Sequence, residues 1–240
     1  MNSLRRRSLI AGLLYFSTHV TSVAALVVYG TEPPDVSTRF DQTPILFGVL
    51  LELALALGVI GTGVVLLPAL RPHGASLAHT FSSLRNVEGA VIIAGSMAML
   101  ALAWTADAGV ATVGLAEAMF NLHKASFLLG QGLVISVNSI VIGVLLRRSG
   151  LVARWIGTLG VFGGGVVLVS NLAQLFGAIE FGGTAAGVAA IPVFTFEICF
   201  AGYLTTKGLR STGHPVARSA RATSELDGAA PSEDAANLGT

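Results

Sequence analysis

The stretch ILFGVLLELALALGVIGTGVVLLPAL, residues 45–70, decides the fold. It contains a single charged residue, Glu52. A helix needs about 20 apolar residues to cross the roughly 30 Å hydrocarbon core of a bilayer. The stretch is long enough for that, and it lacks the alternation of apolar and polar residues that is typical of a membrane strand. We therefore predict a transmembrane helix here.

Five further apolar runs of similar length lie along the chain: Ser8–Tyr29, Val87–Ala106, Ala125–Leu146, Trp155–Phe176 and Ala185–Thr205. Proline-free segments precede two of these runs, so their helices are expected to begin earlier. The predicted helices cover about 8–29, 45–70, 76–106, 113–147, 152–177 and 184–206. We thus predict an all-α polytopic membrane protein, with one six-helix domain over 1–209 and a disordered cytoplasmic tail over 210–240, a segment rich in Ala, Ser, Gly and acidic residues.

Composition excludes the main alternatives. Hydrophobic residues make up 53% of the 240 residues, charged residues only 11%, and the mean hydropathy is +0.76. A soluble domain carries about 25% charged residues. The net charge of +1 gives no basic field for nucleic acid, so the expected partner is the lipid bilayer. The single cysteine, Cys199, excludes an intramolecular disulfide and a metal site built from several cysteines.

The positive charges indicate an orientation. If the N-terminus is cytoplasmic, twelve of the 14 Lys and Arg residues fall on the cytoplasmic side, and only Arg39 and Lys124 fall outside. Because cytoplasmic loops are enriched in Lys and Arg, both termini are predicted to be cytoplasmic. Arg5–Arg7 before an apolar run also resembles a secretory signal, but the run continues through Val28, longer than a typical signal core. We interpret it as an uncleaved membrane helix.

Three carboxylates lie inside predicted membrane helices: Glu52, Glu88 and Glu197. A charge at the centre of a membrane helix costs about 2.5 to 3.5 kcal/mol on insertion scales, which makes these residues informative. From the rise of a helix, Glu52 lies about 10 Å and Glu197 about 13 Å inside the membrane boundary. Arg85, three residues before Glu88, shares a helical face with it and can pair with it.

Two interpretations of these charges remain open. In the structural one, Arg85 pairs with one or two glutamates, and the network fixes the register of the helices. In the functional one, an uncompensated carboxylate binds a cation, carries a proton or contacts a polar solute. Because three glutamates face only one arginine, the functional interpretation stands beside the structural one. The residues themselves give a candidate buried polar site of Glu52, Arg85, Glu88, Asn138 and Glu197, and the resemblance described below adds His123 as its sixth member.

His19 falls near the middle of the first helix, where one hydrogen bond would satisfy it. No second histidine has a spacing suited to haem or zinc, and no cofactor or metal is predicted.

The glycines at 58 and 61, and at 157, 160 and 164, are expected to allow close packing of helices in lipid. Pro192 lies in the sixth predicted helix. It either frees a carbonyl beside Glu197 or only bends the helix for packing.

Several short motifs, in this order and spacing, resemble a bacterial family of uncharacterised six-helix membrane proteins, domain of unknown function 4386. They are MNSLRR at 1–6, LLEL at 50–53, RNVE at 85–88, FLLG at 127–130 after His123, SGLVARWIG at 149–157 and PVFTFE at 192–197. The resemblance covers about Met1 to Leu209. Ala153 stands where the family pattern leads us to expect a proline.

The resemblance implies a multi-pass protein of the bacterial plasma (inner) membrane whose activity is unknown. The recurrent polar positions of the family correspond to Glu52, Arg85, Glu88, His123 and Glu197. It implies no substrate and no catalytic residue.

Three functions are compatible with the sequence. The leading hypothesis is a carrier or proton-coupled permease for a small polar solute. The alternative is a non-transporting membrane partner or sensor with a structural charge network and an unknown protein partner. The third is a metal-independent lipid-modifying enzyme, although no known catalytic motif is present.

Overall fold

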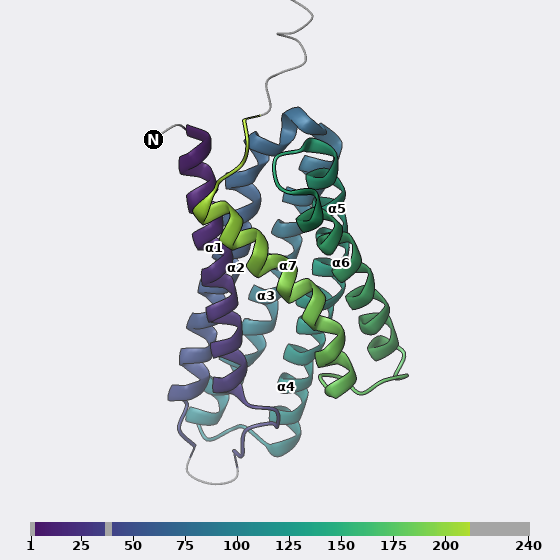
Figure 1. Cartoon of the computed structure of the whole chain (residues 1–240). Helices are drawn as coiled ribbons and strands as arrows, with labels where there is room; N and C mark the ends of the chain where they lie inside the picture. Colours follow the sequence, from purple (N-terminus) through teal and green to yellow (C-terminus); the bar gives the residue numbers. More distant parts are fainter. Residues whose placement is uncertain (1–2, 37–39, 212–240) are drawn as a thin grey trace, which may run out of the picture. The chain divides into compact units, whose positions relative to one another are not determined.

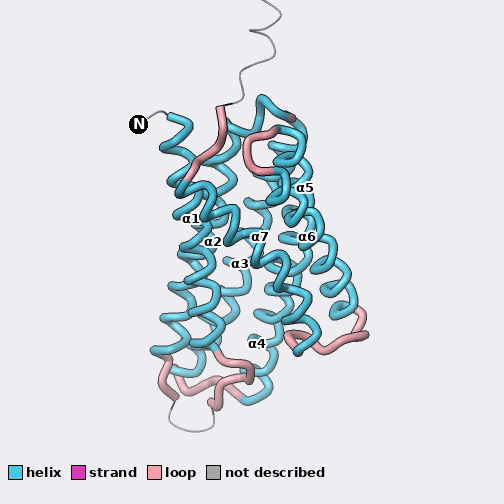
Figure 2. The backbone as a smooth tube through the Cα atoms, viewed as in Figure 1, coloured by secondary structure: helices cyan, strands magenta, loops and turns pink. Residues whose placement is uncertain are grey.

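The computed structural model describes residues 3–36 and 40–211, and within these ranges every regular element is a helix (Figures 1 and 2). Six helical segments are long and apolar enough to span a membrane, which confirms the predicted all-α fold with six spans. The elements are α1 (Ser3–Tyr29), α2 (Thr43–Leu70), the short 3-10 turn η1 (Arg71–His73), α3 (Ala75–Asp107), α4 (Val113–Phe127), the π-helical η2 (Leu128–Val134), α5 (Ile135–Ser149), α6 (Arg154–Leu175) and α7 (Thr184–Thr206).

The helix boundaries differ most from the predicted ones at the start of α1, and elsewhere they differ by two residues or fewer. Helix α1 begins at Ser3, five residues before the predicted start, because the helix continues beyond the apolar run into Arg5–Arg7. Helix α6 begins at Arg154 rather than at 152, because Ala153 is extended and the two residues before it are buried in the core. Nearly all of the predicted tail, from residue 212 onward, lies outside the described residues.

The fourth span contains the π-helical segment η2 between α4 and α5. Such segments are uncommon in helices and occur frequently at functional sites. Its two buried glycines allow close contacts. A Cβ on Gly130 would lie 3.1 Å from Val91 and 3.5 Å from the carbonyl of Glu88, and one on Gly132 would lie 3.1 Å from Asn171. Thus η2 packs directly against α3 and α6.

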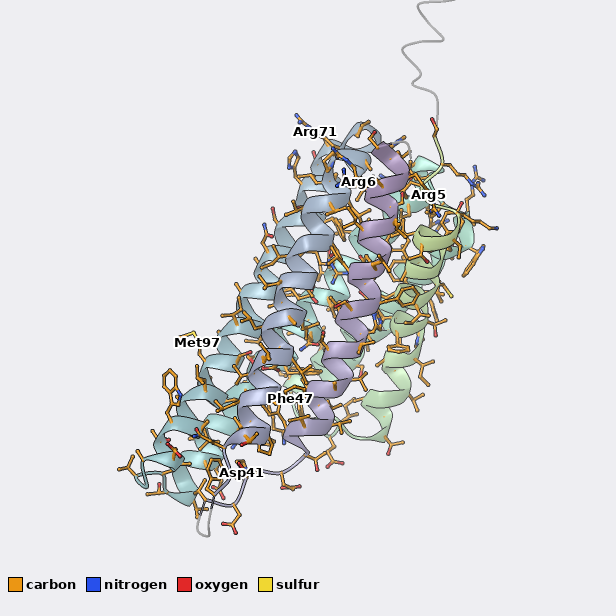
Figure 3. The ribbon with its side chains drawn as sticks, turned by 90° about the vertical axis from the view of Figure 1, so that its left-hand side faces the viewer. Arg5, Arg6, Asp41, Phe47, Arg71 and Met97 are labelled. Carbon is orange, nitrogen blue, oxygen red and sulfur yellow. The ribbon has the colours of Figure 1, made fainter. Side chains whose placement is uncertain are left out.

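The two ends of the bundle differ in charge. We call the end that holds Ser3, η1 and Arg210 the terminal end, and the end that holds the α1–α2, α3–α4 and α6–α7 connections the loop end (Figure 1). Arg5, Arg6 and Arg71 lie at the terminal end and Asp41 at the loop end (Figure 3). The described carboxylates outside the bundle interior all belong to the loop end, and they are Glu32, Asp35, Asp41, Asp107, Glu117 and Glu180.

Three apolar layers follow one another along the bundle. Helix α3 contributes to each of them in sequence order. Phe81 belongs to the layer at the terminal end, Ile92 to a central layer with Leu55, Ala56 and Val59, and Met99 to the layer at the loop end. Polar side chains of α3 alternate with these layers, since Arg85 and Glu88 precede Ile92 and Ser96 follows it. The buried polar groups are therefore divided into two levels.

The first and last helices are joined at the terminal end by Arg5. Its guanidinium donates hydrogen bonds to the carbonyls of Leu204 at 3.0 Å, Thr205 at 2.6 Å and Thr206 at 3.0 Å. These carbonyls end α7 and have no partner within their own helix, so a cation there is favourable.

We expect Arg5→Ala to lower the free energy of unfolding by about 1 to 2 kcal/mol, because three charge-assisted hydrogen bonds to α7 are lost. The neighbouring Arg6 is exposed and serves as the matched control. Thermal unfolding in nanodiscs would measure both variants. Equal stabilities of Arg5→Ala and Arg6→Ala would contradict this role of Arg5.

Close packing of α6 depends on its glycines, as the sequence predicts. A Cβ on Gly157 would lie 2.7 Å from the carbonyl of Gly143, and one on Gly164 would lie 2.7 Å from the carbonyl of Ser136. A Cβ on Gly163 would lie 2.8 Å from the carbonyl carbon of Pro192 and 2.7 Å from the backbone nitrogen of Val193, both on α7. Hence the segment around Pro192 serves as a packing surface for α6. In the same way, Gly58 and Gly61 of α2 face Thr18 and Leu14 of α1.

Adjacent glycines of α6 give a matched pair of variants. Gly164→Ala should destabilise the protein by about 1 to 3 kcal/mol, because its Cβ would meet the backbone of α5. A Cβ on Gly165 meets no atom within 4 Å, so Gly165→Ala should be neutral or slightly stabilising. Thermal unfolding of the two variants checks this prediction. A similar loss of stability in both variants would mean that the close contact between α5 and α6 does not cause the destabilisation.

Candidate functional site

Arg85 is the centre of the first buried cluster. Its Nη1 donates to Glu88 Oε2 at 3.1 Å, and its Nη2 donates to Glu197 Oε1 at 3.1 Å and to the Tyr15 hydroxyl at 2.8 Å. The side chain of Arg85 is only 5% exposed. The planar fork of a guanidinium suits such simultaneous contacts. Because Tyr15 belongs to α1 and Glu197 to α7, this one cation joins three helices.

His19 adds a second ionisable partner for Glu197 to this cluster. Its Nδ1 lies 2.8 Å from the carbonyl oxygen of Tyr15, and its Nε2 lies 3.4 Å from Glu197 Oε2. A carbonyl only accepts, so Nδ1 carries a hydrogen. In a neutral imidazole, Nε2 would then direct its lone pair at a carboxylate. One additional proton, on His19 or on Glu197, would make the contact between Nε2 and Glu197 attractive.

This proton also balances the charge of the cluster. With it, the positive charges of Arg85 and of the proton offset the negative charges of Glu88 and Glu197. Without it, the buried group carries one excess negative charge. The sequence suggests three acids with one cation, and the structure supplies histidines as additional partners.

Glu52 is the centre of a second cluster, nearer to the loop end. Its Oε1 lies 2.7 Å from His123 Nε2. Its Oε2 accepts hydrogen bonds from the Ser96 hydroxyl at 2.7 Å and from the Tyr29 hydroxyl at 3.2 Å. The Tyr29 ring also packs edge-on against the His123 ring, with centroids 4.9 Å apart. Four helices, α1 to α4, each contribute one side chain.

The six predicted site residues therefore divide into two groups rather than one. Arg85, Glu88 and Glu197 meet in the first cluster, and Glu52 and His123 meet in the second. Along α3, Glu88 and Ser96 are separated by a rise of about 12 Å, with Ile92 between them. Asn138 is buried on α5 but contacts neither carboxylate cluster, and its Oδ1 has no hydrogen-bond partner among the residues that the structure describes.

Helix α1 supplies three residues that the sequence analysis did not assign to the site. Tyr15, His19 and Tyr29 contact the two clusters, and Ser22 donates to Gln131 Oε1 of η2 at 2.9 Å. Their spacings of four, three and seven residues place them on one face of the helix. This periodicity is visible in the sequence, but each residue alone is unremarkable in a membrane helix. The hypothesis that His19 is satisfied by one hydrogen bond is incomplete, because Glu197 also contacts it.

Within residues 3–36 and 40–211, no group of three or more His, Cys, Asp and Glu side chains could hold a metal ion. The arrangement instead suits the binding and release of protons, since both clusters pair a carboxylate with an imidazole.

The fold and its buried ionisable groups define a multi-pass membrane protein with polar clusters in its interior. The chain belongs to the family described as Domain of unknown function (DUF4386), which it matches over residues 10–208. This confirms the resemblance inferred from the motifs. No curated protein and no solved structure matches the chain significantly. The matched range includes every residue of both clusters.

Replacing Arg85 should be far more damaging than replacing either acid that it binds. Arg85→Met leaves Glu88 and Glu197 without their shared cation, and such a loss costs about 3 to 5 kcal/mol. Glu88→Gln should cost less, because Arg85 still contacts Glu197. The double variant Arg85→Met with Glu88→Gln should recover part of the loss. Thermal unfolding in nanodiscs measures all three, and a Glu88→Gln loss as large as that of Arg85→Met would contradict the shared-cation arrangement.

Proposed function

We propose that the protein is a proton-coupled carrier for a small polar solute in the bacterial plasma membrane. The observation that carries this proposal is the pairing of the His19 imidazole with the Glu197 carboxylate inside the bundle, 3.4 Å apart and 10% exposed on each side, where one exchangeable proton can be held. A buried proton site of this kind is typical of membrane proteins that move protons or couple them to solutes.

The proton site lies where two helices meet. His19 belongs to α1 and Glu197 to α7, and near it the ring of Phe194 packs against His19 with centroids 4.8 Å apart. Loss of the proton would turn an attraction between α1 and α7 into a lone-pair repulsion, while Arg85 would still hold Glu197. Because Arg85 also holds Tyr15 of α1, protonation is suited to control the local contact between His19 and Glu197. A solute with its own cationic or hydrogen-bonding group would compete for the same carboxylates.

The orientation that we propose follows from the charge of the two ends. The described carboxylates outside the interior lie at the loop end. The terminal end holds most of the described cations, namely Arg5–Arg7, Arg71, Arg147, Arg148, Arg154, Lys207 and Arg210. By the positive-inside rule, the terminal end faces the cytoplasm. The first cluster is then the one closer to the cytoplasm.

The proposal predicts solute-dependent proton movement. Proteoliposomes containing a pH-sensitive dye would be exposed to panels of amino acids, sugars, organic cations and organic anions. At least one solute should acidify or alkalinise the lumen with the wild type, and Glu197→Gln, which removes the charge but keeps the shape, should reduce this rate at least about tenfold. Glu180→Gln, an exposed carboxylate of the α6–α7 connection, serves as the control. A wild type inactive toward every class, in protein shown to be folded, would refute the carrier.

A second candidate is the non-transporting membrane partner or sensor. The observation that favours it is that Arg85 joins α1, α3 and α7 with apolar layers on both sides of its level, as a purely structural network would. In that case, the only effect of Glu197→Gln would be on stability, and a partner protein would copurify with the wild type.

A further inference from the structure

We infer that Glu52 and His123 form a second proton-binding site, which exchanges with the loop end and binds its proton independently of the His19–Glu197 site. This inference rests on the proposed function for its role in coupling, but its geometry stands separately. It assigns to each carboxylate–imidazole pair one exchangeable proton at its own depth in the membrane.

The first support is the pairing itself. Glu52 Oε1 and His123 Nε2 are 2.7 Å apart, and the two side chains are 6% and 11% exposed. At this distance one hydrogen lies between them. A second hydrogen, on Nδ1, makes the imidazole cationic and the pair neutral, so the pair can bind one proton without changing its contact. The partners of Glu52 Oε2 are Ser96 and Tyr29, both neutral donors that leave the charge balance to His123.

The second support is that the Glu52–His123 pair has neighbours of its own and is separated from the Arg85 cluster. Glu52 is bonded by two neutral side chains, Tyr29 of α1 and Ser96 of α3. The nearest cation in the sequence of α4 is Lys124, and its ammonium lies over the rings of Phe120 and Phe181. The Arg85 cluster lies beyond the layer formed by Leu55, Ala56, Val59 and Ile92. Among the residues that the structure describes, no hydrogen bond connects the two carboxylate clusters across this layer. At about 12 Å along α3, the charge coupling between the clusters is much weaker than the coupling inside the 2.7 Å pair, so each acid should act mainly on its own histidine.

The third support is access from the loop end. A hollow of about 270 Å³ lies between the α1–α2 connection and α4, and its lining includes Glu32, Asp35 and Glu117. Ala116 also lines it, and this residue belongs to the apolar layer at the loop end together with Phe120 and Met99. The same layer contains Phe120, three residues before His123 on α4. Carboxylates in the hollow raise the local concentration of protons and other cations above the site.

Nitrogen NMR of the full-length protein, labelled with ¹⁵N at histidine and placed in nanodiscs, tests the inference directly. The five histidines are assigned with single His→Gln variants. At one fixed pH, Glu52→Gln should lower the ratio of charged to neutral His123 about tenfold or more and leave His19 unchanged, because the neighbouring carboxylate favours the charged imidazole. Glu197→Gln should have the converse effect. Glu180→Gln should change neither histidine.

Two results would overturn the inference: an unchanged His123 in folded Glu52→Gln, or a change in both histidines when either acid is replaced. If Glu52→Gln does not fold, Tyr29→Phe replaces it. This variant removes a neutral donor from Glu52, so the charged fraction of His123 should rise, and a constant fraction would also reject the site. These spectra need no solute. Independent titration of the two histidines without any proton-coupled uptake would refute the carrier but keep the second site.

Discussion

The structure depends on keeping one guanidinium inside the membrane. An unpaired cation at the depth of Arg85 would be expelled or would prevent the helix from inserting. The surrounding helices are arranged to avoid this, with a hydroxyl from α1, a carboxylate from α3 itself and a carboxylate from α7. The ring of Tyr15 lies 4.9 Å from the guanidinium carbon, which adds a cation–π contact. The positions of α1 and α7 relative to α3 follow from this requirement.

Two levels of polarity divide the interior, and this division gives the molecule its functional character. A continuous polar channel would conduct ions, whereas separate clusters between apolar layers can bind and release only when the layers rearrange. Close glycine contacts hold the helices together throughout the bundle, between α5 and α6 as well as between α1 and its neighbours α2 and α7. Protonation would therefore act on the side-chain contacts that α1 makes with the clusters.

Much of the fold could be predicted from the sequence, because six apolar runs of sufficient length leave few alternatives in a bilayer. The glycine pattern of α6 likewise predicts close packing, since small side chains serve that purpose in lipid. The π-helical geometry of Leu128–Val134 could not be predicted, because an α-helical pattern and a π-helical one differ by a single residue of register.

For the candidate site, residue types and burial cost identified Glu52, Arg85, Glu88 and Glu197. Their separation into two clusters could not be predicted, because it depends on how helices far apart in sequence pair. The role of His19 was hidden for the same reason, since Glu197 lies on the last helix.

The partners of Arg85 are synthesised at different times. Tyr15 precedes it by 70 residues, and Glu197 follows it by 112 residues. When α3 leaves the translocon, α7 does not yet exist, so the nascent chain must enter lipid with an incomplete set of contacts. Glu88, three residues away on the same helix, is available at once. Of the two carboxylates that bind Arg85, Glu88 is thus the one that can neutralise it before α7 has been made.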